Sequence, residues 1–238
     1  MAEKSSFSFA KYAAQEGAFD EHINASIPNL DGLRADCVSL SQFFIQKRTK
    51  VVDIGCSSGA LLRQVRDFNQ ERYSSAKFVG LDIESGFTKE WAKYREEASN
   101  IQFKVQDART YDYRNSSLVY SIFTLQFLLE KDRLPLVKRI YDGLVDGGAL
   151  ILAEKVVAKN AKFQDMLSTI YHSYKLKHFT ADDVMKKQRD IVDQMKPWSE
   201  FKNFEMLRSA GFVSINTQLF WRRHLFLGIV AYKPAPFR

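Results

Sequence analysis

Three acidic residues mark the ends of three short apolar runs in the first half of the chain. Asp53, Asp82 and Asp107 lie near the end of, close or follow the runs at 50–55, 77–82 and 101–105, respectively. Because parallel strands end at one edge of a sheet, the three carboxylates are expected to line one nucleoside site. We expect Asp82 to accept hydrogen bonds from both ribose hydroxyls and Asp107 from the adenine amino group. The alternative for Asp82 is a helix N-cap.

The loop after the first run helps to decide which nucleoside binds. Small residues between Gly55 and Gly59 form a tight turn before an apolar helical pattern, and their backbone N–H groups are expected to be free for a ligand. A dinucleotide site needs the pattern G-x-G-x-x-G/A. Here those positions hold Gly55, Ser57 and Ala60, so the middle glycine is missing.

S-adenosylmethionine (SAM) fits this loop better than a dinucleotide. It has no pyrophosphate and tolerates a side chain at Ser57, while Gly55 and Gly59 still provide the turn. Asp53 is expected to face the cationic end of SAM, and Cys56 is interpreted as a small loop residue rather than a nucleophile. The alternative is a glycine turn that only closes a strand–helix unit.

The neighbours of the other two acids complete the expected SAM site. Ile83 is predicted to flank the adenine next to Asp82, and Ala108 to lie at the adenine edge next to Asp107. Methyl transfer needs little side-chain chemistry because the sulfonium is already activated, so the protein contributes mainly alignment. We therefore assign no general base from the sequence.

Composition limits the class of protein. The 238 residues are 45% hydrophobic, enough for one core and a single domain over 1–238. No apolar run approaches the roughly 20 residues of a membrane span, and the N-terminus is too polar for a signal peptide. Cys37 and Cys56 make no disulfide framework, and the His and Cys residues lack metal-ligand spacing. A cytoplasmic, metal-free protein is expected.

The charge favours an anionic substrate or a polyanionic partner such as tRNA or another nucleic acid. The net charge is +7 and the pI about 9.3. Basic residues gather within 175–189 and at 222–224. For any one of these residues, a solvated helix face or strand edge is the plainer interpretation.

The order of patterns predicts an α/β fold. A helical segment at 1–47 precedes strands near 50–55, 77–82, 101–105, 117–123 and 148–154 with helices between them. A helical insert or cap at 156–204 is expected to cover the cofactor and to carry the contacts of a homodimer. Two last strands at 211–216 and 225–232 have a short link and must be antiparallel. This predicts a Rossmann-like class I methyltransferase fold, a mostly parallel seven-stranded sheet with a C-terminal antiparallel hairpin.

Several segments, from about Ser26 to Tyr232, resemble the carboxy-S-adenosylmethionine synthase family. The run Phe123-Thr124-Leu125-Gln126-Phe127 is more specific than the glycine loop, and the segments 138–144 and 147–155 agree with it. The resemblance implies SAM or carboxy-SAM as the bound molecule. It also implies synthesis of carboxy-SAM from SAM and prephenate, which serves wobble-uridine modification of tRNA.

The resemblance also implies individual roles. Arg189 falls on the family's arginine that holds the new carboxylate, a role that suits a planar guanidinium. Two positions beside the reacting end of the cofactor depart from the family, with Leu30 in place of a tyrosine and Ile122 in place of an asparagine. Loss of two hydrogen-bonding groups favours an altered reaction. Three functions stay open: methyl transfer to a nucleic acid or small acceptor, narrowly preferred; carboxy-SAM synthesis; and a catalytically silent SAM-binding module.

Overall fold

The computed structural model describes residues 17–94 and 99–235. Helices and strands alternate along most of this length, as predicted. In chain order the elements are α2 (Ala18–Ser26), α3 (Leu30–Ser41), β1 (Lys50–Ile54), α4 (Ala60–Asn69), β2 (Lys77–Asp82), η1 (Ser85–Phe87), α5 (Thr88–Ala92), β3 (Ile101–Val105), η2 (Ala108–Thr110), β4 (Ser116–Ile122), η3 (Leu125–Phe127), α6 (Glu130–Gly143), β5 (Leu144–Val157), α7 (Ala161–Lys175), α8 (Ala181–Ile191), β6 (Trp198–Ser199), α9 (Glu200–Ala210), η4 (Ser214–Asn216), β7 (Thr217–Arg223) and β8 (Phe226–Tyr232).

The sheet confirms the predicted fold class. Seven strands run in the order β3-β2-β1-β4-β5-β8-β7, and the two-residue β6 pairs with the end of β5. The first five strands of this order are parallel, whereas β8 is antiparallel to both β5 and β7. β1 lies between β2 and β4, where the strand order reverses, and ligands of open α/β sheets bind at such a point.

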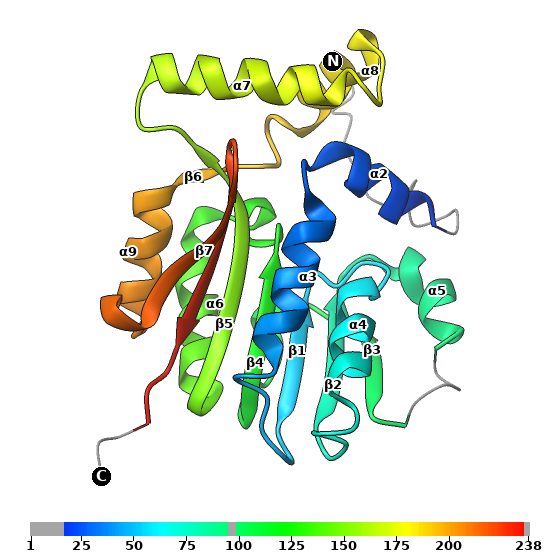
Figure 1. Ribbon diagram of the computed structural model, residues 1–238, viewed down its shortest axis with the longest axis vertical. Coiled ribbons are helices and arrows are strands. Elements are labelled where there is room, and N and C mark those ends of the chain that lie inside the picture. Colours follow the sequence, from blue (N-terminus) through cyan, green and yellow to red (C-terminus); the bar gives the residue numbers. More distant parts are fainter. Residues whose placement is uncertain (1–16, 95–98, 236–238) are drawn as a thin grey trace.

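Helices cover both faces of the sheet (Figure 1). Val51 packs in the core layer under α3 and α4, and Val52 packs in the layer under α6 and α9, because alternate residues of a strand point to opposite faces. Strands buried on both faces read as continuous apolar runs. Asp53 is an exception, because its side chain is buried on the α3–α4 face with only 3% exposed.

Two helices after β5 form a layer over one end of the sheet (Figure 1). α7 starts at the N-cap Asn160, and a Thr180–Asp183 capping box starts α8. The Tyr171 hydroxyl donates to the Ser26 carbonyl, and the Tyr174 hydroxyl donates to the Asn24 carbonyl, so α7 is tied to the end of α2. The expected insert boundary at 204 falls inside α9, which packs against α6 instead of over the cavity end.

The terminal hairpin differs from the prediction in its position. The strand expected at 211–216 is wrong, because 214–216 forms a 3-10 turn in which the Asn216 N–H donates to the Val213 carbonyl. The strand is β7, and residues 220–222, expected in the link, lie within it. His224, at φ 50°, and Leu225 make the turn to β8. The antiparallel pairing is confirmed.

The N-terminal segment is helical where it is described. Residues 1–16, predicted to begin a helix, lie outside the described residues, and α2 covers 18–26. α3 ends at Ser41 rather than 47. Within 17–94 and 99–235, each helix falls short of the length and apolar character needed to cross a membrane.

Gly59 starts α4 with φ +80°, and a Cβ there would collide with the Phe103 ring. We expect Gly59→Ala to destabilise the fold by about 2–5 kcal/mol, the sum of left-handed strain and overpacking. Gly17→Ala is the matched control, because Gly17 has φ +73° and no heavy atom near its Cβ position. It should cost only about 1–2 kcal/mol. Equal losses in guanidinium denaturation would contradict the role assigned to the Phe103 contact.

Candidate functional site

A cavity of about 650 Å³ lies at the carboxyl ends of the parallel strands. Its floor is built by the loops after β1 to β4 and by the end of β5, and α2, α3, α7 and α8 contribute its other walls. The volume is typical of small-molecule sites, which span about 300–1,000 Å³. Most of the predicted cofactor residues line it: Asp53, Gly55, Cys56, Ser57, Asp82, Ile83, Asp107, Ala108 and Ile122.

The backbone N–H groups of the glycine loop are used by the fold. Gly55 and Cys56 both donate to the Leu81 carbonyl, at 2.7 and 3.0 Å, and Gly59 donates to the Cys56 carbonyl. Ser57, at φ 49°, donates its N–H to Asp82 Oδ2 at 2.9 Å. The expectation that the loop N–H groups are free for a ligand is therefore wrong for these four residues, because the loop closes onto the end of β2.

Two carboxyl groups face the cavity, the buried Asp53 and the half-buried Asp82. Burial, followed by the neighbouring Asp82, raises the pKa of Asp53 to about 8, and Arg34 acts in the opposite direction. Among the residues that the structure describes, the Asp53 carboxylate has no hydrogen-bond or ion-pair partner. Burial also raises the pKa of Asp82, while backbone N–H groups of Glu84, Ser57 and Ile83 oppose this shift.

This electrostatic arrangement selects between the two nucleosides. A pyrophosphate needs free N–H donors, and a negative charge beside Asp53 would raise the cost of ionising that carboxyl further. A cationic ligand instead supplies a positively charged partner for these carboxyl groups. SAM carries such a charge on its sulfonium and its amino group. The residues thus fit SAM, and the roles of Asp53 at its cationic end and of Asp82 at the ribose stay predictions.

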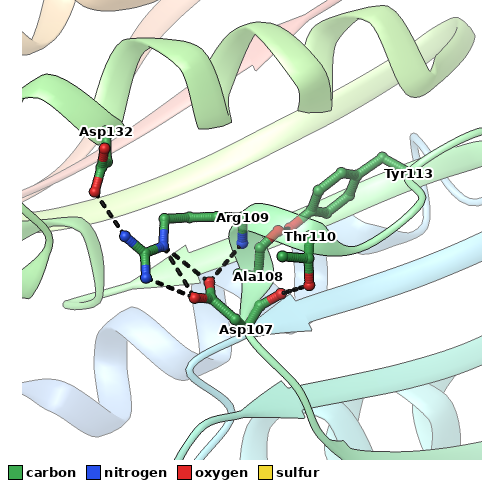
Figure 2. A network of polar contacts seen from close by, with 6 residues as sticks. All are labelled: Asp107, Ala108, Arg109, Thr110, Tyr113 and Asp132. Carbon is green, nitrogen blue, oxygen red and sulfur yellow. Dashed lines mark hydrogen bonds and ion pairs between the residues drawn. The ribbon is translucent and has the colours of Figure 1, made fainter.

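The third acid of the pattern is held by an arginine (Figure 2). Arg109 donates to Asp107 through its backbone N–H, Nε and Nη2, and its Nη1 contacts Asp132 at 2.7 Å. The hydrogen bonds from the Arg109 side chain lower the pKa of Asp107, which keeps this carboxylate charged. The Tyr113 hydroxyl donates to the Ala108 carbonyl at 2.8 Å, so the segment at the cavity edge is fixed in place.

The remaining predicted residues divide into apolar walls and support. Ile83 is 75% exposed and Ile122 is half-buried, and both contribute apolar surface to the cavity. Burial raises the pKa of the Cys56 thiol, which opposes a nucleophilic role. Gly59 does not line the cavity and acts through its packing against Phe103.

The Phe123–Phe127 run ties the site together. The Glu154 carboxylate accepts the N–H groups of Leu125 and Gln126, and Gln126 Oε1 accepts the Lys155 N–H at 2.9 Å. Thr124 Oγ1 donates to the Ile54 carbonyl at the end of β1. The run therefore joins β1, β4 and β5 at the cavity floor, which gives it a positioning role that the sequence did not reveal.

Arg189 is separated from the other predicted residues. It is exposed on α8 and does not line the cavity. Val184, Lys187, Gln188 and Ile191 line the cavity from α8, and this spacing defines one helix face. Arg189 falls outside that face, so the structure does not bring its guanidinium to the site within this chain. Its role toward a carboxylate stays a prediction.

Sequence reasoning missed four cavity residues that carry polar groups. Arg34 pairs with Asp20 at 2.9 Å beside Asp53, and Lys155, Tyr171 and Lys175 lie under the α7–α8 layer. Lys155 stood in the segment that carried the family resemblance, and Lys175 stood in the basic cluster. Neither the family resemblance nor the basic cluster predicted that these lysine side chains line the cavity.

The chain is similar in sequence to known SAM-using proteins. A methyltransferase domain model matches residues 51–148. Carboxy-S-adenosyl-L-methionine synthase of Staphylococcus epidermidis is 33% identical over 216 residues, which cover 90% of this chain and 92% of the relative. The protein of the same name from Trichodesmium erythraeum is 30% identical, over 94% of this chain and 88% of the relative.

Solved structures share the fold at low sequence identity. Human N-acetylserotonin methyltransferase in complex with SAM has a TM-score of 0.62 and 17% identity, over 95% of this chain and 58% of that chain. An O-methyltransferase family protein from Burkholderia thailandensis has the same TM-score and 13% identity, over 97% of this chain and 64% of that chain.

Fold, cavity and relatives together define a SAM-dependent transferase of the class I methyltransferase superfamily. Its substrate or cofactor is SAM, and the acid corner formed by Asp53 and Asp82 suits the cationic and ribose parts of that molecule. Within this class, the chain belongs to the carboxy-S-adenosyl-L-methionine synthase family.

Asp82→Ala is expected to weaken SAM binding about 10- to 100-fold, because it removes a buried acceptor from the ribose and from the Ser57 and Glu84 N–H groups. Calorimetry with SAM and with NAD measures this, and NAD should not bind. Asp67→Ala is the control, since Asp67 is an exposed acid outside the cavity. Unchanged SAM affinity in Asp82→Ala, or tight NAD binding, would contradict the assigned site.

Proposed function

We propose that this protein makes carboxy-SAM from SAM and prephenate. Its family membership supports this reaction, since relatives at 30–33% identity over most of the chain carry that name. The observation that carries the proposal is the extent of the cavity. It continues from the acid corner at Asp53 past Ile122 to Lys155 and the underside of α7 and α8. A second small molecule can therefore meet SAM in a covered space.

A covered site suits the transfer of a carboxylate. SAM supplies an activated methyl carbon when it is bound, and prephenate supplies the carboxyl group. The methyl carbon loses a proton as it bonds to the carboxyl carbon, and prephenate loses its ring hydroxyl with the carboxyl group, so that proton and hydroxyl leave as water and phenylpyruvate remains. The protein aligns the two molecules and keeps out water. The cover also keeps the released carboxyl group next to SAM instead of letting it escape into solvent. The hydrogen bonds from Tyr171 and Tyr174 to the end of α2 support the α7–α8 layer in this covering role.

Methyl transfer to tRNA or a small acceptor is the second candidate. Leu30 and Ile122 favour it, because both line the cavity with aliphatic groups where the resembled family has hydrogen-bonding side chains. Either product can serve tRNA modification. The free, buried Cys37 and Cys56 support a place of action in the reducing cytoplasm. The homodimer stays a prediction, because a single chain is described.

Purified protein incubated with SAM and prephenate should yield carboxy-SAM and phenylpyruvate in equal amounts by mass spectrometry. Asp82→Ala should lose most turnover at limiting SAM, and Asp67→Ala should retain it. Arg189→Ala tests the predicted carboxylate contact, since lost turnover with intact SAM binding would show that this exposed guanidinium reaches the reacting group. Absence of carboxy-SAM together with SAM-dependent methylation of tRNA would replace carboxyl transfer with methyl transfer.

A further inference from the structure

Two lysines lie in the cavity away from the acid corner. Lys155 follows Glu154 near the end of β5, and Lys175 is the last residue of α7. Both line the cavity, and Lys175 is only 9% exposed. Among the residues that the structure describes, neither ammonium has a carboxylate partner or a hydrogen-bond acceptor. Lysine is rarely buried without a partner, so this pair needs an explanation.

One aromatic ring connects the two ammonium groups. Lys155 Nζ lies 5.1 Å and Lys175 Nζ 5.6 Å from the centroid of the Tyr171 ring, and Lys175 Nζ is also 5.8 Å from the Phe179 ring. Cation–π contacts of this kind offset part of the lost hydration, but they do not neutralise charge. Two like charges thus share a small, largely apolar part of the cavity.

The electrostatics show the cost of this arrangement. Burial, with a contribution from Lys175, lowers the pKa of Lys155 to about 8. Burial also lowers the pKa of Lys175. The pKa of the neighbouring His172 is lowered by its own burial and then by the two lysines, which favours the neutral imidazole, so His172 offers the lysines no negative charge. An anion placed between the lysines would relieve their repulsion.

The strand order separates the lysines from the cofactor corner. The acids that fit SAM lie at or just after the carboxyl ends of β1, β2 and β3, on one side of β4 in the sheet, and Lys155 lies near the carboxyl end of β5, on the other side of β4. The wall beside the lysines is aromatic, since the Tyr171 ring contacts Phe226 edge-on at 5.2 Å, and Phe226 contacts Phe123 at 5.8 Å. This part of the cavity therefore combines positive charge with apolar surface.

We propose that Lys155 and Lys175, on either side of the cavity near Tyr171, bind a carboxylate of an organic acid with an apolar body, the second substrate. The inference rests on the proposed function for the presence of a second substrate, and it assigns the residues that recognise it. Lysine suits the role, because its ammonium is a compact charge on a flexible stem that can follow a carboxylate. The Tyr171 and Phe226 rings take the apolar body of the acid.

Calorimetry on SAM-loaded protein, with prephenate and phenylpyruvate as separate probes, tests this assignment. Lys155→Met and Lys175→Met are each expected to weaken prephenate binding about 10- to 100-fold, the loss typical of a charge-assisted contact. SAM affinity should stay within about twofold of the wild type in the same variants. Lys177→Met is the control, since Lys177 is exposed two residues beyond Lys175 and should bind both ligands normally.

A second readout separates binding from a structural role. Without ligands, Lys155→Met and Lys175→Met should melt at or above the wild-type temperature, because each variant removes an uncompensated buried charge. Unchanged affinity for both acids, or no binding of either acid by the wild type, would overturn the assignment. An equal loss of SAM affinity would also overturn it, because the lysines would then hold the carboxylate of SAM. Lysine-dependent acid binding without carboxy-SAM formation would uphold the assignment and reject only the proposed reaction.

Discussion

The structure depends on charge that is buried before any ligand arrives. Asp53 lies near the end of β1, inside the core layer under α3 and α4, where most positions are apolar. An uncompensated carboxylate is costly there, and the fold reduces the cost by raising the pKa of Asp53 to about 8. A cationic ligand supplies what the chain does not. The preference of this corner for a cationic ligand therefore follows from the Asp53 carboxyl group, which the protein leaves without a partner.

Most other polar groups of the cavity floor form hydrogen bonds within the protein. Gly55, Cys56 and Ser57 of the glycine loop donate their N–H groups to the Leu81 carbonyl and the Asp82 carboxylate. Leu125 and Gln126 donate theirs to the Glu154 carboxylate. Arg133 donates to the Gln126, Leu128 and Lys196 carbonyls, so the loop after β4 and the chain returning from α8 are fixed to each other. Among the described residues that line the cavity, the charged groups of Asp53, Lys155 and Lys175 lack a hydrogen-bond or ion-pair partner, and a ligand can supply one.

The sequence predicted the strands and the acid corner because both depend on local patterns. β1 to β3 are short apolar runs, and a parallel sheet brings Asp53, Asp82 and Asp107 to one edge wherever the helices lie. The fate of the loop N–H groups was not predictable, since it depends on the Leu81 carbonyl of a different strand. The hairpin was misplaced by several residues because 211–216 and β7 have similar apolar content, and only the pairing with β8 decides between them.

The orientation of α8 about its axis explains why Arg189, predicted as a site residue, lies outside the cavity. The sequence identified the segment that contains Arg189, but the docking of α8 turns Val184 and Ile191 to the cavity and leaves Arg189 outside. Lys155 was visible in the sequence as part of the segment that carried the family resemblance. Its isolation from acids became visible only when β5 and α7 were placed together.

Asp53 destabilises the folded protein until SAM compensates its charge. The pH dependence of the melting temperature in the wild type and in Asp53→Asn tests this most directly. Asp53 ionises near 3.8 when unfolded and near 8 when folded, so the folded state holds an extra proton between these values. Stability without ligand should therefore fall as the pH rises from about 4 to about 8, and this fall should be shallower in Asp53→Asn. At pH 8 Asp53→Asn should melt higher than the wild type without SAM and lower than the wild type with saturating SAM. Identical pH slopes together with identical stabilisation by SAM would contradict the account.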